Sequence, residues 1–264
     1  MDDPLSREII LTALGTAFVG RALEQHAAID STNTRAVAWA RAGAPDGALV
    51  IAEEQTAGRG RLGRRWHAPP GSALLFSVAL RPALAPAQAQ RATMLCSSAA
   101  VEAIRAVTGL AAQVKWPNDL VIKGRKVGGV LTELGLAGRE LAFVVVGMGL
   151  NVNLDPAAIP EALAPPTSLM AELGRPVPRL PLLCALLQGI EARYLALGEG
   201  LSPVEEWRGH LATLGQPVQV GTPEEVIAGV AEDVDADGAL LVRTPEGALR
   251  IVLVGDVTLR GHRV

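Results

Sequence analysis

The chain contains 264 residues, with 24 lysines and arginines against 27 aspartates and glutamates and a formal net charge of −3. A charge this close to balance gives no indication of a basic nucleic-acid-binding surface or of an acidic tail. Hydrophobic residues make up 49% of the chain but aromatic residues only 3%. We therefore predict a globular protein with an aliphatic core, organised as one large domain or as one domain plus a small one.

The N-terminal region and the cysteines indicate a soluble protein in a reducing compartment. Residues 9–20 form an apolar run, but Asp2 and Asp3 stand where a signal peptide carries basic residues, and the run is too short to span a bilayer. We predict a first helix there and expect a cytoplasmic protein with no membrane partner. Cys96 and Cys184 lie far apart in apolar stretches, where buried thiols are expected rather than a disulfide or a catalytic thiol.

Hydrophobic periodicity and turn residues divide the rest of the chain into strands and helices. Strands are predicted at residues 22–29, 48–53, 73–80, 113–116, 120–122, 127–133 and 141–146. Helices are predicted at residues 34–42, 88–107, 168–173, 179–198 and 203–213. After Gly215 the pattern changes to short strands with Gly, Asp and Pro turns through Val264, which is typical of a small β-barrel.

The predicted connections contain most of the unusual sequence. Ser31, Thr32 and Asn33 can cap the helix that follows them, and Gly124 is expected to turn the hairpin that returns at residue 127. Residues 147–153, "GMGLNVN", are predicted to form a loop after the strand at 141–146, and the proline-rich residues 154–166 are predicted to be irregular.

One loop raises a specific question about ligands. Residues 57–66 read "AGRGRLGRRW" and place Gly58, Gly60 and Gly63 in the G-x-G-x-x-G spacing of a dinucleotide-binding turn. That turn needs a helix directly after the third glycine and an acidic residue about 20 positions later. Pro69 and Pro70 follow instead, and the later segment "VALRPAL" contains no acid. We therefore reject a dinucleotide site.

The same loop is better explained by binding of another anion. Glycines allow the backbone N–H groups to approach a ligand closely, and arginines can bond to phosphate or carboxylate oxygens. The four arginines of the loop are Arg59, Arg61, Arg64 and Arg65. A solvated basic loop is the alternative, but glycine alternating with arginine serves no packing purpose.

Five motifs in a fixed order identify a family resemblance. They are "STN" at 31–33, "EEQTAGRGRLGRRW" at 53–66, "KWPNDL" at 115–120, "GRKVGGVLTE" at 124–133 and "GMGLNVN" at 147–153. Together they resemble the biotin–protein ligases, also called holocarboxylase synthetases, over about residues 22–264. Five ordered motifs make this resemblance far more specific than any single one of them.

The resemblance implies an α+β fold with two domains. A catalytic domain, residues 1–214, would contain a mixed sheet flanked by helices of the biotin/lipoate ligase or class II synthetase kind, and residues 215–264 would form an SH3-like β-barrel. Some bacterial members add an N-terminal winged helix that binds DNA. Only thirty residues precede Ser31, so we expect the form without that domain and no DNA partner. The oligomeric state, monomer or homodimer, stays open.

The family reaction has two steps. Biotin and MgATP form biotinyl-5′-AMP, and a lysine on the biotin carboxyl carrier domain of an acceptor such as acetyl-CoA carboxylase then displaces AMP. By resemblance, the residues that contact biotin are Ser31, Thr32, Asn33, Gln55, Gly58, Arg59, Gly60, Arg61, Trp116, Lys126 and Gly128. Ser31 to Asn33 can meet the ureido group while also capping the helix, and Trp116 can wall an apolar slot for the rings.

The remaining family positions concern the nucleotide. Lys126 and Arg61 are the expected catalytic residues, because fixed cations screen the repulsion between carboxylate and phosphate. The expected ATP or adenylate contacts are Arg61, Arg64, Trp66, Asn118, Asp119 and Asn151. Asp119 is also the candidate ligand for Mg²⁺, although Pro-Asn-Asp can equally form a plain turn. Arg260 is a weaker candidate to reach the nucleotide from the C-terminal domain.

Two other functions remain possible from the sequence. A lipoate- or octanoate-transferring enzyme would share a lysine after a glycine-rich strand, but the intact "GRGRLGRRW" and the C-terminal barrel argue against it. A module that senses or retains an adenylate would bind the same ligands without transferring them to a lysine.

Overall fold

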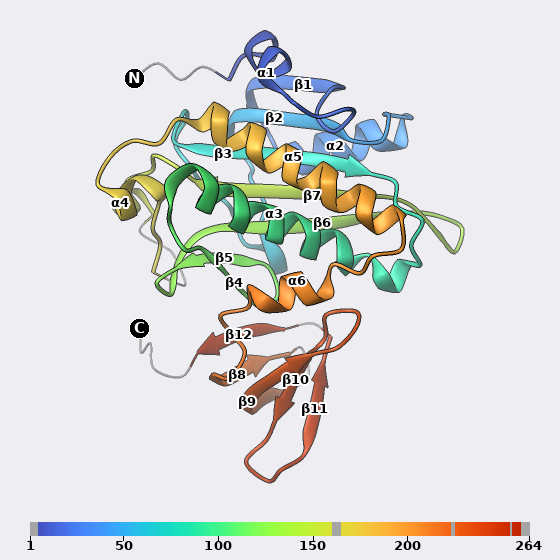
Figure 1. Cartoon of the computed structure of the whole chain (residues 1–264), viewed down its shortest axis with the longest axis vertical. Coiled ribbons are helices and arrows are strands. Elements are labelled where there is room, and N and C mark those ends of the chain that lie inside the picture. Colours follow the sequence, from blue (N-terminus) through green and yellow to red (C-terminus); the bar gives the residue numbers. More distant parts are fainter. Residues whose placement is uncertain (1–4, 160–164, 223–224, 254, 260–264) are drawn as a thin grey trace.

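A computed structural model describes residues 5–159, 165–222, 225–253 and 255–259. A seven-stranded mixed sheet forms the centre of the larger domain, in the order β1-β2-β3-β7-β6-β5-β4 (Figure 1). Its strands are β1 (Leu23–Ile29), β2 (Ala48–Gln55), β3 (Ala73–Leu80), β4 (Gln113–Lys115), β5 (Asp119–Ile122), β6 (Arg125–Ala137) and β7 (Glu140–Asn151). β1 and β2 are parallel, and every other neighbouring pair in this sheet is antiparallel.

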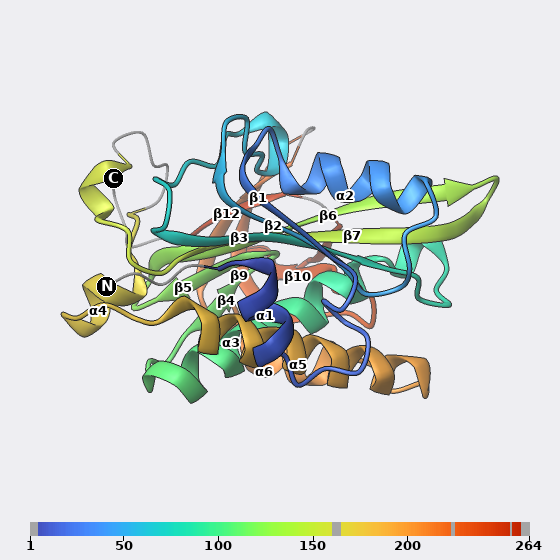
Figure 2. The ribbon, with the colours of Figure 1, turned by 90° about the horizontal axis from the view of Figure 1, so that it is seen from above.

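Helices cover both faces of this sheet, as Figure 2 shows from above. One face carries α1 (Arg7–Ala13), α3 (Gln90–Thr108), α5 (Arg179–Gly198) and α6 (Val204–Gly209), and the other carries α2 (Thr32–Arg41). The short helix α4 (Leu169–Leu173) lies beyond one end of the strands. Because helices lie on both sides, the eight residues of β3 are all buried, and all of them except Ser77 are apolar.

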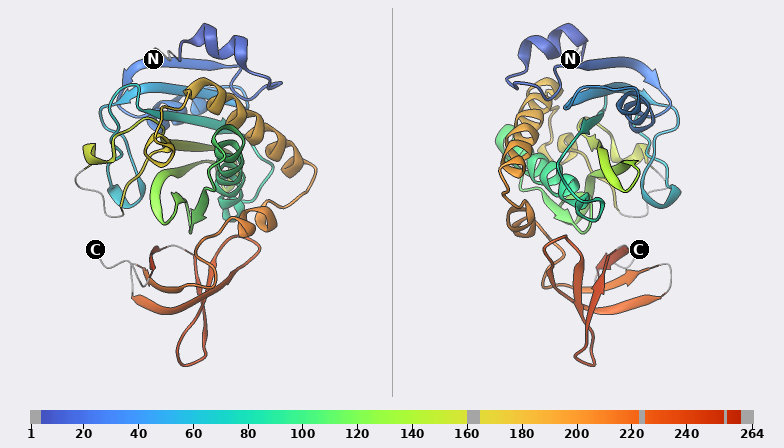
Figure 3. Two further views of the ribbon diagram at one scale, coloured as in Figure 1. Left: turned by 60° about the vertical axis from the view of Figure 1, so that its left-hand side comes forward. Right: turned by 90° about the vertical axis from the view of Figure 1, so that its right-hand side faces the viewer.

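The C-terminal segment forms a separate antiparallel sheet of five strands, in the order β11-β10-β9-β8-β12 (Figure 3). Its strands are β8 (Pro217–Gly221), β9 (Val226–Val234), β10 (Leu240–Arg243), β11 (Leu249–Val252) and β12 (Asp256–Leu259). The predicted α+β fold with a small SH3-like β domain is therefore confirmed. We propose Leu214 as the last residue of the larger domain, since Gly215 turns the chain with a φ of +75° just before β8.

A buried tryptophan joins the two domains. Trp116 is 2% exposed, and its indole Nε1 donates a hydrogen bond to the carbonyl oxygen of Gly238 at 2.9 Å. The Trp116 backbone N–H donates to the Thr213 hydroxyl at 2.9 Å. The bond to Gly238 fixes the C-terminal sheet beside the end of the larger sheet at which β4 and β5 meet, and the bond to Thr213 anchors Trp116 to the segment that leads into the C-terminal sheet.

Helix α5 is long and apolar enough to cross a membrane by length and composition alone. In this fold it is part of the core, because Leu182, Leu183, Leu186 and Leu187 are fully buried. The buried guanidinium of Arg179 at its start is paired with Glu53 at 2.6 Å. We therefore interpret α5 as a core helix.

Two predicted boundaries are wrong because tertiary contacts decide them. The "GMGLNVN" motif was expected to form a loop from residue 147, but β7 continues to Asn151 and pairs with β3 and β6 at once. The helix expected at 203–213 ends at Gly209. Residues after it lie along β4 instead, where Val114 accepts the N–H of Ala212 and donates to the carbonyl of His210, both at 2.8 Å.

The first predicted helix is also shorter than residues 9–20, since α1 ends at Ala13. The segment after it is held by the buried carboxylate of Glu191 on α5, which accepts the backbone N–H groups of Ala17, Phe18 and Val19 at 2.7 to 2.9 Å. Burial raises the pKa of the Glu191 carboxyl, but these three donors outweigh burial and hold the pKa below its ordinary value of 4.5.

We predict that Glu191→Gln lowers the free energy of unfolding by about 1.5–3 kcal/mol at pH 7, because a neutral amide replaces a charged acceptor. A carboxyl with a lowered folded pKa stabilises the protein above its unfolded pKa and loses that contribution as the pH falls through the folded pKa. The gap between wild type and variant should therefore shrink below pH 4.5 in urea titrations. A gap that stays constant down to pH 3 would contradict this role for the charge.

Candidate active site

A cavity of about 790 Å³ lies where the ends of the central strands meet the Gly/Arg loop and strand β12. The start of α2, the turn before β5, and β6 and β7 contribute its walls. This volume is at the upper end of the roughly 300–1,000 Å³ of typical small-molecule pockets. Most of the predicted site residues therefore gather around one space, although they come from segments that are far apart in sequence.

Fourteen predicted site residues line this cavity: Ser31, Thr32, Asn33, Gln55, Arg59, Gly60, Arg61, Arg64, Trp66, Trp116, Asn118, Asp119, Lys126 and Asn151. Two predicted residues, Gly58 and Gly128, do not. A Cβ at Gly58 would meet the carbonyl oxygen of Trp66, and one at Gly128 would lie 2.8 Å from the carbonyl oxygen of Gly149. These two glycines permit close backbone packing beside the cavity. Arg260 lies outside the described residues, as does part of the segment 154–166.

The turn at the start of α2 forms a polar network at one end of the cavity. Ser31 caps α2 by accepting the N–H of Thr34. The backbone N–H and the hydroxyl of Thr32 both donate to Gln55 Oε1, at 2.8 and 3.0 Å. Asn33 Oδ1 accepts from the buried Ser77 hydroxyl at 2.6 Å. Capping and lining of the cavity are thus combined in one turn, as its sequence suggested.

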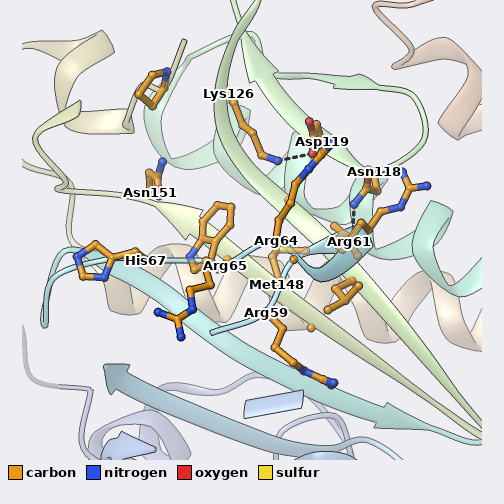
Figure 4. Close-up of a pocket in the computed structure, with 18 of the residues that line it drawn as sticks. Arg59, Arg61, Arg64, Arg65, His67, Asn118, Asp119, Lys126, Met148 and Asn151 are labelled. Carbon is orange, nitrogen blue, oxygen red and sulfur yellow. Dashed lines mark hydrogen bonds and ion pairs between the residues drawn. The ribbon is translucent and has the colours of Figure 1, made fainter. Parts of the chain in front are cut away.

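The Gly/Arg loop is a narrow hairpin rather than an open coil. Trp66 N–H donates to the carbonyl of Gly58 at 2.9 Å, and Gly60 N–H donates to the carbonyl of Arg64 at 2.8 Å. Arg61 Nη1 reaches Asn118 Oδ1 at 3.2 Å (Figure 4). Burial lowers the pKa of the Arg61 guanidinium, although the carboxylates of Asp256 and Asp119 oppose that shift.

Lys126 is held beside a carboxylate at the other end of the cavity. Its Nζ lies 2.5 Å from Asp119 Oδ1 and 5.8 Å from the centre of the Trp66 ring (Figure 4). The Lys126 backbone is fixed on its outer side, because its N–H donates to the carbonyl of Pro165 and its carbonyl accepts from Thr167. Both backbone bonds position the ammonium group from the segment that follows the proline-rich region.

Two buried polar atoms of the described residues have no hydrogen-bond partner at this site. They are Trp66 Nε1 and Asn151 Oδ1. The Trp66 ring lies over β7 at Gly149, where any Cβ would overlap the indole. Since buried polar groups are nearly always satisfied by protein, water or ligand, this donor and this acceptor are available to a ligand that enters the cavity.

Several cavity residues were not predicted. Lys115 lines the cavity, and burial lowers the pKa of its ammonium group, against the opposing effect of Asp119. Asp256 on β12 forms an ion pair with Arg64 and lies 4.0 Å from Arg61. Lys115 adjoins the "WPND" motif and could have been suspected from it. Nothing in the sequence indicates that Asp256, 192 residues away from Arg64, would reach the loop.

The arrangement is suited to anionic ligands. Arg61, Arg64, Lys115 and Lys126 line one part of the cavity, and the acidic residues among its described lining residues are Asp119 and Asp256. Among the described residues no group of three or more His, Cys, Asp or Glu side chains forms a metal site. The site can therefore bind and neutralise anions, and a metal ion would have to share its ligands with a bound substrate.

The stability of a Ser77 variant tests the polar network independently of any ligand. We predict that Ser77→Ala lowers the free energy of unfolding by about 1–3 kcal/mol, because the buried Asn33 side chain loses its donor. Ser98→Ala is the matched control, since the Ser98 hydroxyl is equally buried but has no hydrogen-bond partner. Equal unfolding free energies for the two variants in urea titrations would show that the network contributes no stability.

Comparisons with known proteins agree with this geometry. Residues 26–151 match the biotin/lipoate A/B protein ligase family, and residues 213–260 match the biotin protein ligase C-terminal domain. The chain is 34% identical to the bifunctional ligase/repressor BirA of Bacillus subtilis, over 94% of this chain and 77% of that protein. It is also 34% identical to the biotin–[acetyl-CoA-carboxylase] ligase of Mycobacterium tuberculosis, over 92% of this chain and 91% of that one.

A similar structure is that of the Aquifex aeolicus biotin protein ligase in complex with biotin and ATP. It superimposes with a TM-score of 0.75 at 29% identity, over 91% of this chain and 99% of that one. The chain therefore belongs to the biotin protein ligase family.

Proposed function

We propose that this protein is an ATP-dependent biotin–protein ligase of the biotin–[acetyl-CoA-carboxylase] type. In the first step a biotin carboxylate oxygen attacks the α-phosphorus of ATP, which forms biotinyl-5′-AMP and releases pyrophosphate. In the second step the ε-amine of an acceptor lysine attacks the acyl carbon, loses a proton and displaces AMP. The observation that carries the proposal is the convergence of Lys126 and Arg61 on one cavity that also contains the polar turn of α2.

Electrostatic stabilisation is the main task of the site. The biotin carboxylate and the α-phosphate are both anionic and repel each other as the new bond forms. Lys126 Nζ and the Arg61 guanidinium are fixed cations in a partly closed cavity, so they reduce this repulsion without having to reorganise during the reaction. This mechanism needs no covalent enzyme intermediate.

The polar turn is suited to the ureido ring of biotin, which has two N–H donors and one carbonyl acceptor. Gln55 Oε1 already accepts from the backbone N–H and the hydroxyl of Thr32, which fixes its amide. Asn33 is engaged through both its amide nitrogen and its oxygen, so we assign it to orienting the turn more than to direct contact. Trp116 contributes at the domain junction, because its indole N–H is bonded to Gly238.

The nucleotide is expected beside Trp66 and Asn151. The unpaired Nε1 of Trp66 and Oδ1 of Asn151 supply one donor and one acceptor, which matches the mixed hydrogen-bonding edge of adenine or ribose. Arg64 and Lys115 line the same cavity and are positioned to accept the phosphates. The Aquifex aeolicus relative with biotin and ATP bound supports room for both substrates.

Asp119 and Asn118 are the oxygen ligands that would hold the Mg²⁺ ion accompanying ATP. This small donor set fits the ion, since Mg²⁺ keeps several waters and shares one or two carboxylates with substrate phosphates. When bound, the ion would neutralise phosphate charge. Asp119 is paired with Lys126 in this structure, so the residue also orients the catalytic ammonium group.

The partner would be a biotin carboxyl carrier domain, and we place the enzyme in the cytoplasm, where such acceptors are made. A lipoate- or octanoate-transferring enzyme is disfavoured by the intact Gly/Arg loop and by the C-terminal β domain.

The test is transfer of biotin to a purified carrier domain. With biotin and MgATP the wild-type protein should biotinylate one lysine, detected as a single mass increase, and lipoate should not compete. No product under saturating substrates would overturn the proposal. An adenylate that forms without transfer would indicate an adenylate-retaining module instead.

Single substitutions test the assigned cations. Lys126→Ala or Arg61→Ala should slow pyrophosphate release roughly 100- to 1,000-fold, because each removes a preorganised charge from the transition state. Lys123→Ala is the matched control, since that lysine is 73% exposed at the hairpin tip and should leave the rate near wild type. Full activity in Lys126→Ala would refute its catalytic assignment.

A further inference from the structure

Glu133 connects the Gly/Arg loop to the polar turn of α2, although it was not among the predicted site residues. It lies on β6, with its side chain 31% exposed. Its Oε1 atom accepts a hydrogen bond from Asn33 Nδ2 at 2.9 Å and forms an ion pair with Arg59. One carboxylate oxygen therefore bonds both to the buried turn and to the loop that covers the cavity.

Arg59 differs from the other loop cations in its direction. Figure 4 shows its guanidinium pointing away from the Lys126–Asp119 pair, whereas Arg61 extends to Asn118. Arg59 therefore does not contribute to the anion-binding part of the cavity in this structure. Its partner lies at the opposite part, beside the turn that we assign to the biotin rings.

The Glu133 carboxylate is held in place by the turn of α2, independently of its contact with the Gly/Arg loop. Asn33 is 4% exposed, and its amide is fixed by the carbonyl of Leu131 and by the Ser77 hydroxyl. An ion pair between two mobile surface side chains contributes little, because both lose conformational freedom. Here Glu133 is already immobilised by Asn33, so Arg59 alone must be ordered when the pair forms.

We infer that Glu133 is a positioning residue for biotin recognition, which tethers the Gly/Arg loop through Arg59 over the ring-binding part of the cavity. The inference rests on the proposed function, since it takes biotin as the ligand. The ion pair with Arg59 and the hydrogen bond with Asn33 act together. They stabilise the arrangement in which the Gly/Arg loop lies over the biotin rings. Glu133 does not contact the reacting carboxylate or phosphate.

Glu133→Gln isolates the charge, because the glutamine carbonyl can still accept from Asn33 while the ion pair with Arg59 is lost. Glu232→Gln is the matched control, since Glu232 also pairs with one arginine, Arg243, but at an exposed position on strand β9 of the C-terminal sheet. The first readout is limited trypsin digestion of the ligand-free protein, followed by mass spectrometry of cleavage after the loop arginines. The second readout is the biotin Kd from calorimetry. The third is the rate of pyrophosphate release at saturating biotin.

We expect Glu133→Gln to be cleaved in the loop roughly two- to fivefold faster and to bind biotin weaker by a similar factor. The rate at saturating biotin should stay near wild type, as should all readouts for Glu232→Gln. In an Arg59→Gln background, Glu133→Gln should have no further effect. Loop cleavage at the wild-type rate, or the same effect of Glu133→Gln with and without Arg59, would overturn the tether.

The two proposals fail in different ways. Wild-type protein that gives no heat with biotin would overturn the proposed function and the recognition role of Glu133, while the trypsin comparison would still decide whether the tether exists. Wild-type protein that binds biotin, together with a Glu133→Gln variant of unchanged Kd, would overturn the recognition role alone.

Discussion

Three cations around the cavity are each paired with a carboxylate. Lys126 is paired with Asp119, Arg64 with Asp256 and Arg59 with Glu133. In the anion-binding part of the cavity the carboxylates of Asp119 and Asp256 offset the positive charges of Lys126 and Arg64, which would otherwise repel each other. In the proposed reaction the substrate carboxylate and phosphate groups would take over Lys126 and Arg64, so this part of the site exchanges one set of anions for another, whereas Arg59 would stay paired with Glu133.

The rest of the fold serves to bring these groups together. The pairs join β5 to β6, the Gly/Arg loop to β6, and the loop to β12 of the C-terminal sheet. The C-terminal domain is therefore part of the site and not an appendage, because Asp256 on β12 reaches the loop while Trp116 fixes the domain junction. Glycines at 147 and 149 on β7 allow Asn33 and Trp66 to lie directly against the strand.

Sequence patterns predicted the elements well where local signals were strong. The strand at 73–80 and the helix at 179–198 have the predicted boundaries, because a run that is apolar except for Ser77 and a long leucine-rich stretch leave little choice. The end of β7 was missed because its glycines resemble a turn, whereas they serve close packing beneath Asn33 and Trp66. The helix at 203 was overextended because pairing of residues 210–212 with β4 is a tertiary contact.

The candidate site shows the same difference between residues predicted from local motifs and residues placed by tertiary contacts. Motif residues such as Lys126 and Arg61 were predicted because their neighbours resemble a known family. Glu133 lies at the end of a quoted motif, yet its role depends on where Arg59 and Asn33 fold in space. Ser77 and Asp256 lie outside every motif, and only the pairing of strands and domains brings Ser77 beneath the polar turn and Asp256 to the cavity. Interaction partners that lie far apart in the sequence were therefore the feature of the site that local sequence patterns could not predict.

The most direct test of this account compares biotin with its uncharged methyl ester by calorimetry on the wild-type protein. The two ligands share the rings and differ in the one charge that the cations are proposed to receive. The account predicts that biotin binds at least about tenfold more tightly, equivalent to about 1.4 kcal/mol for a charge-assisted contact. Equal affinities, or tighter binding of the ester, would contradict it.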